Sequence, residues 1–66
     1  MVIKFSVRIY KLSVVKSAIK AYRGLADFSI KEKKDYFEVG LENIDKEVKD
    51  IIQDEFCNYV LALMKA

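Results

Sequence analysis

The sequence contains few side chains with reactive atoms, and their spacing does not assemble a catalytic site. The 66 residues include no histidine, so a nucleophile such as Cys57 or Ser17 lacks the usual general base. Because Cys57 stands on an apolar segment, burial is expected to raise its pKa and keep the thiol protonated. Asp54 and Glu55 are adjacent, so on a helix their carboxylates point in different directions. The sequence therefore predicts a protein that is not an enzyme.

The same residues argue against a cofactor. A structural zinc ion needs four Cys or His ligands, and the chain has one cysteine and no histidine. A single cysteine also excludes a disulfide within the chain and is typical of a reducing compartment. There is no run of about 18 apolar residues and no signal-peptide pattern at the N-terminus. We expect a cytoplasmic protein without a cofactor and without a membrane segment.

The chain is long enough for one hydrophobic core and too short for two. Domains seldom run below about 50 residues, so residues 1–66 are expected to form a single small domain. A core of this size contributes only roughly 3–5 kcal/mol of stability, and neither a disulfide nor a metal can add to it here. We therefore expect a homodimer or another protein partner to supply additional buried surface.

Hydrophobic periodicity divides the first half of the sequence into a strand and a helix. Residues 2–10 alternate between apolar and polar, with the apolar side formed by Ile3, Phe5, Val7 and Ile9. A helix of about three turns is then predicted from apolar residues three or four positions apart: Val15, Ala18, Ile19 and Tyr22. Ser13 is expected to cap its start, and Gly24 to end it in the left-handed conformation.

The second half predicts a hairpin followed by a second helix. Alternation marks one strand at Phe28 and Ile30 and another at Phe37, Val39 and Leu41, with the charged turn 33–35 between them. From about residue 45 to the end, a helical stripe comprises Val48, Ile51, Ile52, Phe56, Tyr59, Val60 and Leu63. Asp45 is the expected cap, and Glu47 is expected in the first turn, where a carboxylate favours the helix dipole.

These elements predict an α+β fold, a two-layer sandwich in the order β-α-β-β-α. Each strand has one apolar face, so both helices are expected to cover one face of a three-stranded mixed sheet. A right-handed crossover makes the first two strands parallel, and the hairpin makes the third antiparallel to the second. Strand order 1-3-2 is favoured, and 1-2-3 is the alternative. Either order leaves the first strand at an edge without a proline to protect it, so a partner strand could dock there.

The end of the second helix is apolar nearly all the way round. One face of such a helix belongs to the chain's own core, and the remainder needs a second surface. The sequence predicts a partner interface formed by Phe56, Cys57, Val60, Leu61 and Met64. The alternative is that the last helical turn exposes a few apolar side chains to water.

Charge is distributed unevenly along the chain. Residues 1–34 carry a net charge of +7, and residues 35–66 carry −5. A basic stripe on the first helix consists of Lys16, Lys20 and Arg23, and an acidic stripe on the second of Glu47, Asp50 and Asp54. The stripes could steer a charged partner or meet across a dimer, and as an alternative they are solvated outer faces. Nucleic-acid binding through the basic stripe is disfavoured, because the net charge is only +2 and no paired aromatic platform occurs.

The pattern resembles the HxsD family, the small proteins of the His-Xaa-Ser peptide-modification systems. The resemblance rests on Tyr10 before the first helix, residues 19–23 within it (Ile-Lys-Ala-Tyr-Arg), the apolar positions of the hairpin, and residues 55–59 (Glu-Phe-Cys-Asn-Tyr). It spans nearly the whole chain. It implies a cytoplasmic accessory protein, encoded beside radical-SAM enzymes, whose partner is a modification enzyme or a precursor peptide.

Two functions from different classes follow. The first is a non-catalytic accessory protein that binds a partner protein or peptide by strand addition or through the last helix. The alternative is a small nucleic-acid-binding domain that uses the basic first helix.

Overall fold

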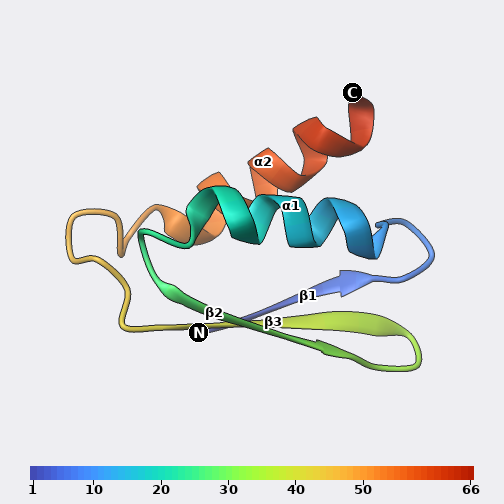
Figure 1. The fold of residues 1–66 in the computed structure, drawn as a ribbon, viewed down its shortest axis with the longest axis horizontal. Helices are drawn as coiled ribbons and strands as arrows, with labels where there is room; N and C mark the ends of the chain where they lie inside the picture. The colour runs from blue at the N-terminus through green and yellow to red at the C-terminus, as the bar shows by residue number, and fades with distance from the viewer.

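A computed structural model describes all 66 residues and contains the five elements in the predicted order. They are β1 (Val2–Ser6), α1 (Leu12–Tyr22), β2 (Asp27–Glu32), β3 (Tyr36–Glu42) and α2 (Ile52–Lys65). Both helices lie on one face of the sheet, which leaves the other face uncovered (Figure 1). The α+β two-layer sandwich is confirmed.

The strand order is β1-β3-β2, which confirms the favoured topology. In the register, Val39 of β3 lies between Ile3 of β1 and Ile30 of β2. Both neighbouring pairs are antiparallel, so the sheet is antiparallel and the prediction of a mixed sheet was wrong. The reason is that β1 and β2 do run parallel, but β3 lies between them and pairs with each.

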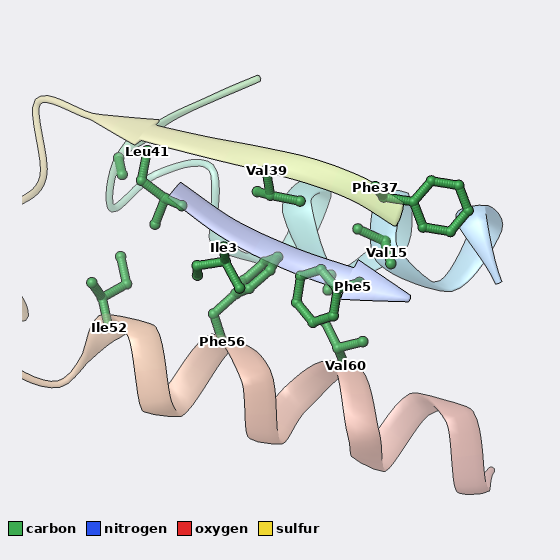
Figure 2. Close-up of a cluster of buried hydrophobic side chains, with 11 residues drawn as sticks. Ile3, Phe5, Val15, Phe37, Val39, Leu41, Ile52, Phe56 and Val60 are labelled. Atoms are coloured by element: carbon green, nitrogen blue, oxygen red, sulfur yellow. The ribbon is translucent and has the colours of Figure 1, made fainter. Parts of the chain in front are cut away.

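The core lies between the sheet and the helices and is centred on Phe56. Its ring centroid lies 6.0 Å from that of Phe5, 5.5 Å from that of Tyr22 and 5.3 Å from that of Phe28. One side chain of α2 thus contacts residues of β1, α1 and β2. Figure 2 shows the cluster of buried side chains: Ile3, Phe5, Val15, Ala18, Ala26, Phe37, Val39, Leu41, Ile52, Phe56 and Val60.

The first strand is shorter than its alternation predicts. The Ser6 carbonyl oxygen accepts hydrogen bonds from the backbone N–H groups of Ile9 and Tyr10, at 3.2 and 2.9 Å, so the chain turns sharply after residue 6. The side chain of Ile9 is 65% exposed, and its prediction as a core residue was wrong. Val7 still packs against the core.

The predicted caps of α1 are not used. The helix begins at Leu12 with Lys11 as its N-cap, so Ser13 lies inside the first turn and does not cap it. At the other end Arg23 is right-handed, and Gly24 does not take a positive φ. The left-handed residue is Asn43, at φ 50°, whose Nδ2 donates to Asp27 Oδ2 at 2.8 Å.

The second helix begins later than predicted. Residues 46–51 form turns, and regular helix starts at Ile52. Asp45 Oδ1 accepts from the backbone N–H of Glu47 at 2.9 Å, so this aspartate caps the turn segment and not the helix. The acidic residues of the first helical turn are Asp54 and Glu55. Because Glu47 and the neighbouring Asp50 precede the helix, the predicted acidic stripe on one helical face does not form.

Candidate partner-binding site

The backbone of β1 leaves hydrogen-bonding groups unpaired along one edge of the sheet. The Val7 N–H donates to the carbonyl oxygen of Asp35, the residue directly before β3, at 3.1 Å. Backbone groups alternate between the two sides of an antiparallel strand, so the odd-numbered residues of β1 face β3. The backbone groups that point outward therefore belong to Val2, Lys4 and Ser6.

The turn after β1 fixes how long this edge is. The Ser6 carbonyl is occupied by the two N–H groups of the turn. The outward groups that stay unpaired are the N–H groups of Val2, Lys4 and Ser6 and the carbonyl groups of Val2 and Lys4. They offer a short row of alternating donors and acceptors to an added strand.

The opposite edge, formed by β2, is better protected. The Lys33 N–H donates to the Tyr36 carbonyl at 2.9 Å, so the backbone groups of Lys33 face β3. Because backbone groups alternate between the two sides of a strand, those of Phe28, Ile30 and Glu32 point outward. Charged side chains crowd this strand and its turn, with Lys31, Glu32 and Lys33 in succession. Charge on an edge, lysine above all, discourages strand pairing. The edge of β1 carries one charged side chain, Lys4, and is the more open of the two.

The structure separates the five residues of the predicted helix interface. Phe56 and Val60 are fully buried in the chain's own core, so they cannot contact a partner directly. Leu61 is 42% exposed, and Cys57 and Met64 are half-buried. These last three residues are spaced at positions i, i+4 and i+7 and share one side of α2. We call Cys57, Leu61 and Met64 the α2 flank.

The α2 flank lies on the same side of the molecule as the edge of β1. On its other side α2 meets α1, where the rings of Tyr22 and Tyr59 are 5.3 Å apart. Leu61 follows Tyr59 by two residues, about 200° around the helix, and so points away from α1. Figure 2 shows α2 running beside β1, with Phe56 and Val60 directed toward it. The flank and the strand edge therefore border one continuous surface.

The basic stripe lies on the outer surface. Lys16, Lys20 and Arg23 are all exposed, while Val15 and Ala18 form the buried side of α1. Arg23 follows the last helical residue and so continues the stripe past the end of α1. On the uncovered sheet face the aromatic side chain is Tyr36, which is overlaid by the Lys4 ammonium at 4.9 Å from the ring centroid. This face does not offer the paired aromatic platform of common RNA-binding modules.

Two hollows indent the surface. One, of about 250 Å³, lies on the uncovered sheet face around Gly40 and is bordered by Val2, Ser29, Lys31 and Glu38 among others. The other is an apolar cleft of about 230 Å³, where the end of α1 meets the turns before α2. Its walls are formed by Tyr22, Leu25, Val48, Ile51, Ile52 and Glu55. Sequence periodicity missed this cleft because it assigned residues 48 and 51 to a continuous helix.

Two titratable side chains near these surfaces, Cys57 and Tyr22, have raised pKa values. Burial, and secondarily the Asp54 carboxylate, raises the pKa of the Cys57 thiol, as the sequence predicts. Burial also raises the pKa of Tyr22, together with the Glu55 carboxylate. No group of three or more His, Cys, Asp or Glu side chains is arranged to hold a metal ion. Neither helix has the length and apolar character needed to cross a membrane.

Comparison of the chain with protein-family models, with curated proteins and with solved structures gave no match.

Proposed function

We propose that this protein is a non-catalytic accessory that binds an extended segment of a partner protein or peptide by adding it to β1 as a fourth strand. The observation that carries the proposal is the row of outward backbone groups at Val2, Lys4 and Ser6. Main-chain hydrogen bonds supply affinity in this mode of recognition, and alternate side chains supply specificity.

The surroundings of the edge define the chemistry of the bound segment. Its side chains would alternate between the two faces of the sheet. Those on the helix side would meet the α2 flank, where apolar residues are favoured. Those on the other side would lie beside Val2 and Lys4, where a carboxylate next to the ammonium is favoured. An alternating apolar and polar segment with an acidic residue fits this surface best.

The resemblance to the HxsD family supports a particular setting for this activity. In that setting the bound segment belongs to a modification enzyme or a precursor peptide of a radical-SAM peptide-modification system, in the cytoplasm. The lone thiol of Cys57 is compatible with a reducing compartment.

The test is a proline in β1 at a position whose N–H points outward. Lys4→Pro removes one outward donor and leaves the hydrogen bonds to β3 in place, as edge strands permit. Lys4→Thr is the matched control, because it also removes the contact with Tyr36 but keeps the N–H. We expect Lys4→Thr, which lacks the ammonium, to copurify more weakly with the modification enzyme or precursor peptide encoded beside the gene, and Lys4→Pro to lose it. Failure of the unaltered chain to bind either molecule would contradict the proposal.

The α2 flank is tested separately by light scattering and the same copurification. Leu61→Glu and Met64→Glu place charge beside the strand edge without altering its backbone. We expect both changes to weaken capture of the partner, and to dissociate any homodimer that uses this surface. Equal capture by these variants and the unaltered chain would remove the α2 flank from the site.

Nucleic-acid binding is the second candidate, motivated by the exposure of Lys16, Lys20 and Arg23. Such binding would weaken steeply with added salt, because each neutralised phosphate releases counterions. A mobility shift with RNA or DNA at low salt that disappears in Lys16→Glu/Lys20→Glu would favour it. Absence of any shift would exclude it.

A further inference from the structure

The two ends of the molecule carry surface features of opposite kind. At one end, the turn between β1 and α1 holds Ile9, which is 65% exposed, more than any other large apolar side chain. Arg8 and Lys11, both exposed, flank it. We call Ile9 with these two cations the basic knob. A protruding isoleucine between two positive charges is a feature that another surface can bury.

At the opposite end lies the apolar cleft. Figure 1 shows the turn after β1 at one end of the long axis, which measures 32 Å, and the segment between β3 and α2 at the other. Five of the six residues that line the cleft are apolar. Its volume of about 230 Å³ is several times the roughly 30 Å³ that a water molecule occupies in the liquid, so an aliphatic side chain has room to enter.

Acidic side chains predominate in residues 45–55, the segment that forms one wall of the cleft, while Arg23 follows Tyr22 on the other wall. Residues 45–55 contain two lysines and five exposed carboxylates. The carboxylates belong to Asp45, Glu47, Asp50, Asp54 and Glu55. The Glu55 side chain itself lines the cleft. An apolar side chain with positive charges on both sides, such as the basic knob, is therefore complementary to this site in both polarity and charge.

We propose that Ile9 of one copy of this chain inserts into the apolar cleft of the next copy. Arg8 and Lys11 then lie against the carboxylates around the cleft. Knob and cleft lie at opposite ends of the long axis, so in an end-on contact each pair of copies keeps one free knob and one free cleft, and the contact is head to tail. Successive copies form an open chain or a ring. The backbone bond from Ile9 to Ser6 holds the knob in its turn without a partner.

The contact is small, which sets its strength. One side chain and its charged neighbours bury less area than the roughly 1,000 Å² typical of stable interfaces, so association is weak and concentration-dependent. The exposed ion pairs make it weaker still as salt rises. This assembly is independent of strand addition at β1, since it uses neither the outward backbone groups nor the α2 flank.

The test uses two variants that each disable one half of the contact. Ile9→Asp removes the knob and places a negative charge before the acidic cleft. Ile51→Asp polarises the cleft, and it does not disturb the core because Ile51 is 51% exposed. Residue 51 also directly precedes the first residue of α2, where a carboxylate favours the helix dipole, so we expect the variant to retain its helix.

Sedimentation equilibrium at low salt and at concentrations up to the millimolar range gives the readout. We expect the average mass of the unaltered chain to rise beyond that of a dimer, and each variant alone to remain a monomer. An equimolar mixture of the two variants retains one intact knob and one intact cleft, and so should form a dimer and nothing larger. Circular dichroism verifies that both variants are folded.

Val2→Asp is the control, since Val2 is 54% exposed and lies on β1 away from both features. It should associate like the unaltered chain. If Val2→Asp loses association while Ile9→Asp and Ile51→Asp keep it, self-association uses the edge of β1. That result would overturn this proposal and support strand addition at β1. A monomeric unaltered chain at millimolar concentration, or variants that do not form a dimer when mixed, would also overturn it.

Discussion

The hydroxyl group of Tyr22, at the end of α1, donates a hydrogen bond to the backbone carbonyl oxygen of Glu55 in α2, at 3.2 Å. The ring of the same tyrosine lies edge-on to Phe56 and beside Tyr59. One side chain thus joins the two helices by both polar and aromatic contacts, and it also forms a wall of the apolar cleft. Tyr22 therefore helps to fix the two helices relative to each other.

Replacing Tyr22 by phenylalanine removes the hydrogen bond and keeps the aromatic contacts. We expect the free energy of unfolding to fall by about 0.5–1.5 kcal/mol, near the lower end because the bond is exposed to water. Urea denaturation monitored by circular dichroism gives this value. An unchanged midpoint would mean that the hydrogen bond contributes nothing to stability.

The pH dependence of stability provides a second test of the Tyr22 contact. Burial and the Glu55 carboxylate raise the pKa of Tyr22 in the folded chain, so the folded state holds the phenolic proton more tightly than the unfolded state. The associated stability is fully present below the ordinary tyrosine pKa near 10 and is lost as pH rises through the raised value. Stability should therefore decline above about pH 10 more steeply in the unaltered chain than in Tyr22→Phe.

Phe56 is expected to be the residue least tolerant of truncation. Its ring contacts Phe5, Tyr22 and Phe28, and Phe56→Ala would cost about 3–5 kcal/mol. That cost is comparable with the whole stability of a domain of this size, so the variant should be largely unfolded by circular dichroism. Leu61→Ala, on the exposed side of the same helix, should stay folded and change stability by about 0.5 kcal/mol or less.

Gly40 lies in the central strand and weakens it. A Cβ atom at this position would lie 2.7 Å from the Ser29 Oγ across the β2–β3 pair. Gly40→Ala alone should be close to neutral, because the gain in backbone rigidity is offset by displacement of that hydroxyl. Combined with Ser29→Ala, it should stabilise by about 0.5–1 kcal/mol relative to Ser29→Ala alone. A destabilised double variant would show that the sheet needs glycine here for another reason.

Cys57 should react slowly with thiol reagents. Because burial and the Asp54 carboxylate raise its pKa, the thiol remains protonated at neutral pH. Alkylation by iodoacetamide at pH 7.5 should be slower in the folded chain than in urea, and it should accelerate as pH rises past the ordinary thiol value near 8.5. Asp54→Asn removes the second cause of the shift and should increase the rate in the folded chain. The same rate in both states would contradict the burial of this thiol.

Local patterns predicted the element order and the inward residues of three strands, because alternation and helical spacing record which side chains meet the core. They did not predict where elements end. Ile9 continues the alternation, yet the turn that consumes the Ser6 carbonyl directs it into water. Ser13 and Gly24 have the chemistry of caps, but the tertiary positions of α1 place its ends elsewhere.

The candidate site was predictable only in part, for a related reason. The prediction of β1 as an open edge was possible because both strand orders considered, 1-3-2 and 1-2-3, place it at the end of the sheet, and because it contains no proline. The division of the last helix into buried Phe56 and exposed Leu61 depends on where α2 crosses the sheet, which no local pattern contains. The cleft depends on Leu25 and Val48, which are distant in sequence and meet only after folding.

The position of β1 in the sheet also governs how the fold opens. Hydrogen bonding of β1 to β3 reaches across as many as 40 residues, as between Met1 and Leu41, whereas β2 and β3 are joined by a short turn. Closing the long loop costs more chain entropy, so we expect β1 to detach before β2, in spite of the burial of Ile3 and Phe5 in the core. Within β3, the amide of Val39 faces β1 and that of Gly40 faces β2. Two adjacent amide protons of one strand should therefore exchange with solvent deuterium at different rates, Val39 faster than Gly40.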